Sequence, residues 1–182
     1  MIRFSKFRAA AAFRRFHRAT EGNVTVEFVI IVPLMFIILA SSIEMGLITV
    51  RQTFLDRALD LTVRDIRLGT GADWQHDQIR DKICERSILI NNCSTDLKLE
   101  MTQLDPYAPI TMPETPDCID SAVEVDPVVK FVNGDSNELM FLRACQSFNP
   151  VFPHIGLGAD LVKDGDGRVN VLASSIFVQE PK

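Results

Sequence analysis

One apolar run near the start of the chain constrains its fold more than any other feature. The run extends from Phe28 to Val50, and Glu44 is its only charged residue. Its twenty-three residues reach about 34 Å as an α-helix, and the hydrocarbon core of a bilayer is about 30 Å thick. The sequence therefore predicts one helix that crosses a membrane.

A basic arm precedes the apolar run and ends at Gly22. It holds six Lys and Arg residues, which are Arg3, Lys6, Arg8, Arg14, Arg15 and Arg18. Basic residues beside a membrane helix stay in the cytoplasm, so we expect everything after about Val50 to lie outside it. Without residues 1–22 the net charge would fall from −5 to −10. That acidity disfavours nucleic acid and anionic membrane surfaces as partners of the soluble part.

Two simpler interpretations of this segment stay open. A secretory signal has a short basic region, an apolar core of about 7–15 residues and a small-residue cleavage site, and Ala40-Ser41-Ser42 is a weak site of that kind. A signal-anchor that is never cut needs only the apolar helix. Neither interpretation explains why Glu27, the carboxylate at the start of the run, follows Gly22 by five residues.

The helix is expected to continue beyond the membrane as a stalk with one packing face. Apolar residues recur at helical spacing from Phe54 to Ile66. Gly69 and Gly71 then end the helix, since glycine adopts the left-handed cap conformation at little cost. The chain thus divides into a basic leader at residues 1–22, a transmembrane and stalk helix at 23–71, and an exported head domain at 72–182.

The head is predicted to be α+β, with a small antiparallel sheet packed on the stalk. A second helix is expected from about Trp74 to Leu89, with Asp73 as its N-cap. A proline-rich loop follows at residues 105–118, and turns are expected at Asn133-Gly134-Asp135 and before the last strand. Alternating or apolar runs predict strands at residues 97–102, 123–132, 139–148 and 169–178.

All four cysteines lie on the side of the helix that is expected to be exported, where thiols are oxidised. They allow three pairings, of which the sequence favours Cys84 with Cys93 and Cys118 with Cys145. The first bond would close a short loop at a helix end. The second would join the proline-rich loop to a late strand.

The segment from Gly22 to the stalk resembles the TadE/TadF-like pseudopilins of the bacterial tight-adherence (Tad) pilus system. The resemblance covers roughly residues 21–71 and is carried by Gly22, Glu27-Phe28, Pro33 and Glu44. It implies a pilin-like minor subunit that a prepilin peptidase cuts between Gly22 and Asn23, with Glu27 and Phe28 recognised in processing or assembly. It also implies a single-pass protein of the inner membrane with a periplasmic head. The implied partners are other pilin or pseudopilin subunits and the assembly platform, and the implied role is pilus assembly and adherence.

Glu27 and Glu44, the two carboxylates at the start of and within the apolar run, each have two possible environments. A carboxylate at the edge of hydrocarbon is costly unless it is paired. Glu27 either pairs with the new amine of a neighbouring subunit's Asn23 or reaches into the headgroups. Glu44, on the outer flank of the run, faces a partner helix or reaches the water of the outer leaflet.

Other chemistry finds little support in the sequence. Asp160, Asp164 and Asp166 resemble part of a calcium loop, but Ser175 stands where that loop needs a glutamate, so an Asp-Gly turn is the preferred interpretation. The sequence contains no Gly-x-Ser-x-Gly, His-Glu-x-x-His or phosphate-loop motif. We therefore expect no enzyme, metal or cofactor. The alternative function is an uncleaved bitopic protein whose external domain binds a ligand or partner.

Overall fold

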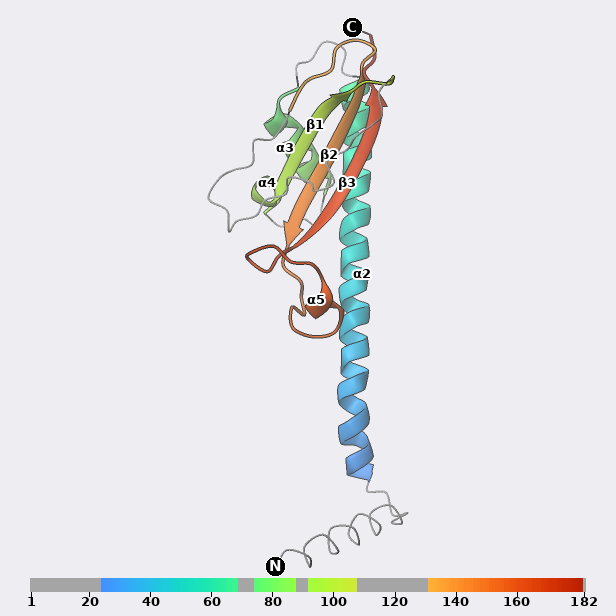
Figure 1. Cartoon of the computed structure of the whole chain (residues 1–182), viewed down its shortest axis with the longest axis vertical. Coiled ribbons are helices and arrows are strands. Elements are labelled where there is room, and N and C mark those ends of the chain that lie inside the picture. The colour runs from blue at the N-terminus through green and yellow to red at the C-terminus, as the bar shows by residue number, and fades with distance from the viewer. Residues whose placement is uncertain (1–23, 69–73, 88–91, 108–130, 182) are drawn as a thin grey trace, which may run out of the picture. The chain divides into compact units, whose positions relative to one another are not determined.

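The computed structural model describes residues 24–68, 74–87, 92–107 and 131–181, and these form an α+β fold (Figure 1). The elements in chain order are α2 (Val24–Leu68), α3 (His76–Arg86), α4 (Cys93–Asp96), β1 (Leu97–Leu104), β2 (Leu139–Phe148), α5 (Leu157–Asp160) and β3 (Val169–Val178). The predicted fold class, with a long apolar helix, a short second helix and a small antiparallel sheet, is confirmed. Most of the predicted proline-rich loop and of the strand at 123–132 lies outside the described residues.

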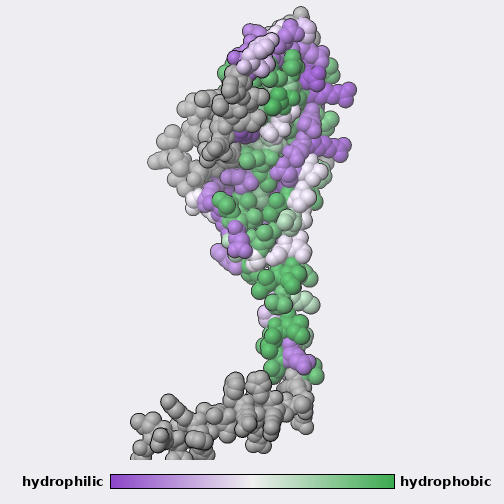
Figure 2. All heavy atoms as spheres, turned by 45° about the vertical axis from the view of Figure 1, so that its right-hand side comes forward, coloured by the Kyte–Doolittle hydropathy of each residue, from purple (hydrophilic) through white to green (hydrophobic). Residues whose placement is uncertain are grey.

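Helix α2 is continuous over 45 residues and includes Pro33. The chain divides after Leu39 into two compact units. In the first unit the described residues run from Val24 to Leu39, and all of them are exposed apart from half-buried Val32. Apolar surface covers most of this exposed helix in Figure 2. Among the described residues, α2 is the one helix long and apolar enough to cross a membrane.

The second unit contains the sheet, whose strands have the order β1-β2-β3 and are all antiparallel. In β1 the alternate residues Leu97, Leu99 and Met101 are buried, as expected for a strand with one face on the core. Leu104 pairs with Leu139 at one end of β2. At the other end of β2 the chain leaves the sheet at Phe148 and enters the segment that contains α5.

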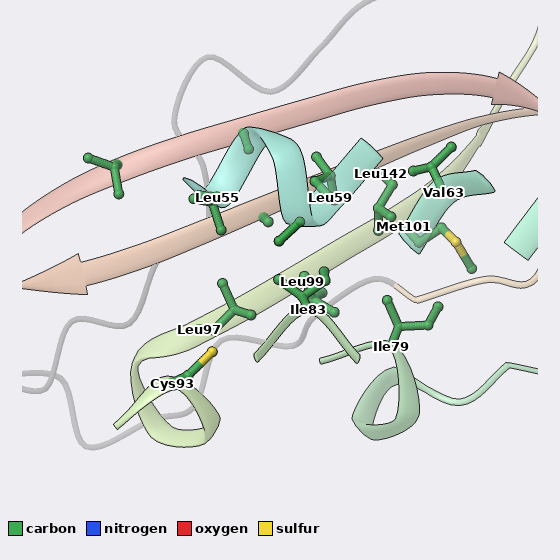
Figure 3. Close-up of a cluster of buried hydrophobic side chains, with 14 of the residues drawn as sticks. Leu55, Leu59, Val63, Ile79, Ile83, Cys93, Leu97, Leu99, Met101 and Leu142 are labelled. Carbon is green, nitrogen blue, oxygen red and sulfur yellow. The ribbon is translucent and has the colours of Figure 1, made fainter. Parts of the chain in front are cut away.

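The core lies where the C-terminal half of α2, α3 and the inner face of the sheet meet (Figure 3). Leu55 and Leu59 of α2 are buried, as are Ile79 and Ile83 of α3. Burying a leucine side chain contributes about 1.5–3 kcal/mol relative to leaving it exposed. The amphipathic half of α2 is thus held by the head through ordinary hydrophobic packing, as the apolar spacing predicted.

Two local predictions were wrong. Helix α3 begins at His76 rather than near Trp74 and ends at Arg86. Its N-cap is Gln75, whose backbone N–H donates to the side-chain oxygen of Gln78 at 3.1 Å. This reciprocal type of cap fixes the start of the helix at this point. The proposed cap Asp73 and the proposed end Leu89 lie outside the described residues.

The turn before β2 also differs from the prediction. It is centred on Ser136 and Asn137, where Asn137 has a positive φ of 66° and Glu138 N–H donates to the Asp135 carbonyl at 3.2 Å. Gly134 serves packing instead, because a Cβ at this position would lie 2.6 Å from Met140 Sδ. Asparagine tolerates the left-handed conformation that such a turn requires.

Candidate functional site

The N-terminal end of the apolar helix holds the residues predicted for processing and assembly. Gly22 and Asn23 lie outside the described residues. Glu27 lies in the first turn of α2 and is exposed, and Phe28 beside it is 64% exposed. The positive end of the helix dipole favours a carboxylate in this turn. The geometry therefore leaves both side chains available to another chain or to lipid.

Glu44, the other carboxylate of the apolar run, occupies a built site in the second unit. Only 1% of the residue is exposed. One carboxylate oxygen accepts a hydrogen bond from Val151 N–H at 3.1 Å, and the other accepts one from Phe152 N–H at 2.9 Å. One helical turn earlier, Ser41 Oγ accepts a hydrogen bond from Leu157 N–H at 3.1 Å. Three backbone donors are thus held by two side chains of α2.

These donors belong to residues 149–163, which we call the α5 loop. Gly158 is buried under Glu44, and a Cβ on it would overlap the Phe152 carbonyl oxygen and lie 3.7 Å from Glu44 Cδ. Lys163 Nζ donates to the carbonyls of Pro153 and Ala159 at 3.0 and 3.2 Å, which closes the loop on itself. The loop is therefore folded around the Glu44 carboxylate.

Both sequence interpretations of Glu44 are corrected by this arrangement. The side chain faces neither a partner helix nor outer water, because its own chain covers it. Sequence reasoning missed the α5 loop as its partner, since the donors are backbone N–H groups 107 and 108 residues away. The one available signal was physical: a single carboxylate in an apolar run needs hydrogen-bond partners.

Farther along α2, ion pairs join this helix to α3 of the head. Asp65 Oδ2 lies 2.6 Å from Arg86 Nη2 and 3.3 Å from Lys82 Nζ, both on α3. The hydrogen bond from Arg86, with a further one from Lys82, lowers the pKa of the Asp65 carboxyl below its ordinary value. This cluster links α2 to α3 at the edge of the hydrophobic core.

A disulfide joins Cys84 of α3 to Cys93 of α4, with a Cα–Cα distance of 5.5 Å. This is the first pairing that the sequence favoured, and it closes the connection after α3. Cys145 is buried in β2. Cys118 lies outside the described residues, so the second pairing stays a prediction.

The aspartates before β3 form a turn. Asp164 Oδ1 accepts hydrogen bonds from Asp166 N–H at 3.1 Å and Arg168 N–H at 2.7 Å, and Oδ2 lies 3.3 Å from Arg168 Nε. Gly167 follows with a φ of +79°. The carboxylate is thus used within the turn, and the described residues contain no group of three or more His, Cys, Asp or Glu side chains arranged to hold a metal ion.

These features define a class of protein: a single long apolar helix whose C-terminal half carries a small disulfide-bonded α+β domain. Residues 22–64 match the family model described as TadE-like protein. The resemblance predicted from the sequence is therefore confirmed for this segment. TadE-like proteins are not an enzyme family. No curated protein and no solved structure matches the chain.

Proposed function

We propose that this chain is a membrane-anchored minor pseudopilin that a prepilin peptidase cuts after Gly22 and that then takes part in Tad pilus assembly. The observation that carries the proposal is the form of α2. It begins with exposed apolar turns that contain one early carboxylate, and it continues without a break into the stalk of a folded head. The match to the TadE-like family covers this same helix.

The orientation follows from charge. Six basic residues precede Gly22 and stay in the cytoplasm, which leaves the head on the periplasmic side of the inner membrane. The disulfide between Cys84 and Cys93 fits an oxidising compartment. Processing and recognition residues thus lie at one membrane surface and the folded domain at the other.

In this proposal Glu27 forms an ion pair with a neighbouring subunit during assembly. Cleavage after Gly22 would create a new amine on Asn23, four residues before Glu27. In a bundle of packed apolar helices, the amine of one subunit and the Glu27 carboxylate of its neighbour would neutralise each other. A charge buried without its partner is strongly destabilising. The pair would therefore fix the axial register between neighbouring subunits.

Two variants test this proposal in cells that contain an active prepilin peptidase and the pilus machinery. Replacing Gly22 with leucine should leave the protein in the membrane at its unprocessed size. Replacing Glu27 with glutamine should permit insertion and impair piliation. Asp160→Asn, an exposed change in the head, is the matched control and should be processed and assembled normally. If the unaltered chain and Gly22→Leu both stay at the unprocessed size in these cells, and Glu27→Gln is piliated normally, an uncleaved bitopic anchor is favoured instead.

A further inference from the structure

The depth of Glu44 in the membrane can be worked out from the helix. Glu44 lies seventeen residues after Glu27 on the continuous helix α2, which is about 26 Å at 1.5 Å per residue. A bilayer core is about 30 Å thick. With Glu27 at the cytoplasmic boundary, Glu44 lies about 4 Å inside the outer boundary of the hydrocarbon, and Ser41, one helical turn earlier, lies about 9 Å inside it. Tilt of the helix would place them deeper.

A carboxylate at that depth must be satisfied inside the protein, because hydrocarbon offers no hydrogen bonds. The α5 loop supplies them through Val151 N–H and Phe152 N–H. Figure 1 shows this loop and α5 beside α2. Since the loop is fastened to Glu44 and Ser41, it must lie at the same level, which is the outer membrane interface.

Three apolar exposed side chains of the loop suit that level, while the exposed polar residues Asn149, His154 and Asp160 would face the headgroups or water. Val151, Ile155 and Val162 are 53%, 48% and 91% exposed. Irregular backbone is not tolerated in contact with lipid tails, but apolar side chains at the interface insert about 5–10 Å below the headgroups. The attraction is hydrophobic rather than electrostatic.

We propose that the α5 loop is a membrane-interface element: the lipid of the outer leaflet covers Val151, Ile155 and Val162, and Glu44 fastens the loop to the membrane helix. The head is thereby held at a fixed height and rotation on the bilayer before assembly. This inference rests on the proposed insertion of α2 but not on cleavage at Gly22.

Quenching of tryptophan fluorescence by brominated phosphatidylcholine tests the proposal on the full chain in vesicles. The chain has one tryptophan, so Trp74→Phe gives a silent background. Val162→Trp and Ile155→Trp then report on the loop. Ile37→Trp, in the exposed apolar part of α2, is the control for insertion. Tyr107→Trp is the control for the aqueous head, because Tyr107 is 97% exposed and follows the end of β1 that pairs with Leu139, away from Phe148.

We expect both loop probes to emit at shorter wavelength than Tyr107→Trp and to lose intensity in brominated lipid, while Tyr107→Trp loses little. If Ile37→Trp is quenched and both loop probes behave like Tyr107→Trp, water or another protein chain faces the loop and the proposal is overturned. If Ile37→Trp is also unquenched, α2 is not inserted, and the proposed function fails together with this inference.

Discussion

Replacing Glu44 with leucine should release the α5 loop while leaving the hydrophobic core folded. Leucine is close to glutamate in size and suits an apolar helix, but it accepts no hydrogen bond. The change removes two hydrogen bonds to a charged acceptor, each worth about 1.5–3 kcal/mol. Together they stabilise the closed loop by about 3–6 kcal/mol. Because a free loop can hydrate its own backbone, the loss should appear as local opening rather than as global unfolding.

Hydrogen–deuterium exchange of the membrane-reconstituted chain measures this opening directly. At tenfold per 1.4 kcal/mol, protection of Val151, Phe152 and Leu157 amides should fall by about 100-fold or more, up to the full protection they have in the unaltered protein. Amides of β2, which belong to the core, should change little. Glu44→Gln keeps one acceptor oxygen, so the protection of these amides should fall between that in Glu44→Leu and that in the unaltered protein.

The matched control is Asp160→Asn, which removes an exposed carboxylate from the same loop. It should leave the exchange of the loop unchanged. Equal protection of the three amides in Glu44→Leu and in the unaltered protein would refute the assignment of Glu44 as the fastening residue, and with it the depth argument for the loop.

Further predictions concern the head. Asp65→Asn should lower the free energy of unfolding at neutral pH by about 1 kcal/mol or less, because the cluster is partly exposed. Since the folded pKa of Asp65 is lowered, this contribution is present above about pH 4 and is lost as the pH falls through the folded pKa; a difference that does not shrink as the pH is lowered below about 4 would contradict this. Joint replacement of Cys84 and Cys93 by serine should lower the free energy of unfolding in urea by about 2–3 kcal/mol, because the bond removes the loop-closure entropy of a segment that spans nine residues. An unchanged urea midpoint would contradict this prediction. Gly158→Ala should increase proteolysis of the α5 loop, whereas Gly46→Ala, where a Cβ meets nothing within 4 Å, should not; equal proteolysis of the two would show that the close approach is not needed.

Elements with a strong local pattern could be predicted from the sequence. The apolar run and the spacing from Phe54 to Ile66 gave one helix, observed as Val24–Leu68. Strands β2 and β3 were predicted with the observed limits. Their residues are apolar or alternate over ten positions, which is a signal that needs no tertiary context.

What could not be predicted depends on particular side-chain contacts, two of them local and one between distant parts of the chain. The start of α3 is decided by the Gln75 and Gln78 cap, which competes with an equally reasonable aspartate two residues earlier. The role of Gly134 is decided by Met140. The partners of Glu44 are backbone N–H groups, which every non-proline residue carries, so no residue type in the sequence points to the α5 loop.

The N-terminus of the mature protein tests the central claim most directly. Intact mass and N-terminal sequencing of the chain extracted from membranes of cells with an active prepilin peptidase should give Asn23 as the first residue. An N-terminus at Met1 or Ile2 in those cells would contradict the account of this chain as a processed pseudopilin.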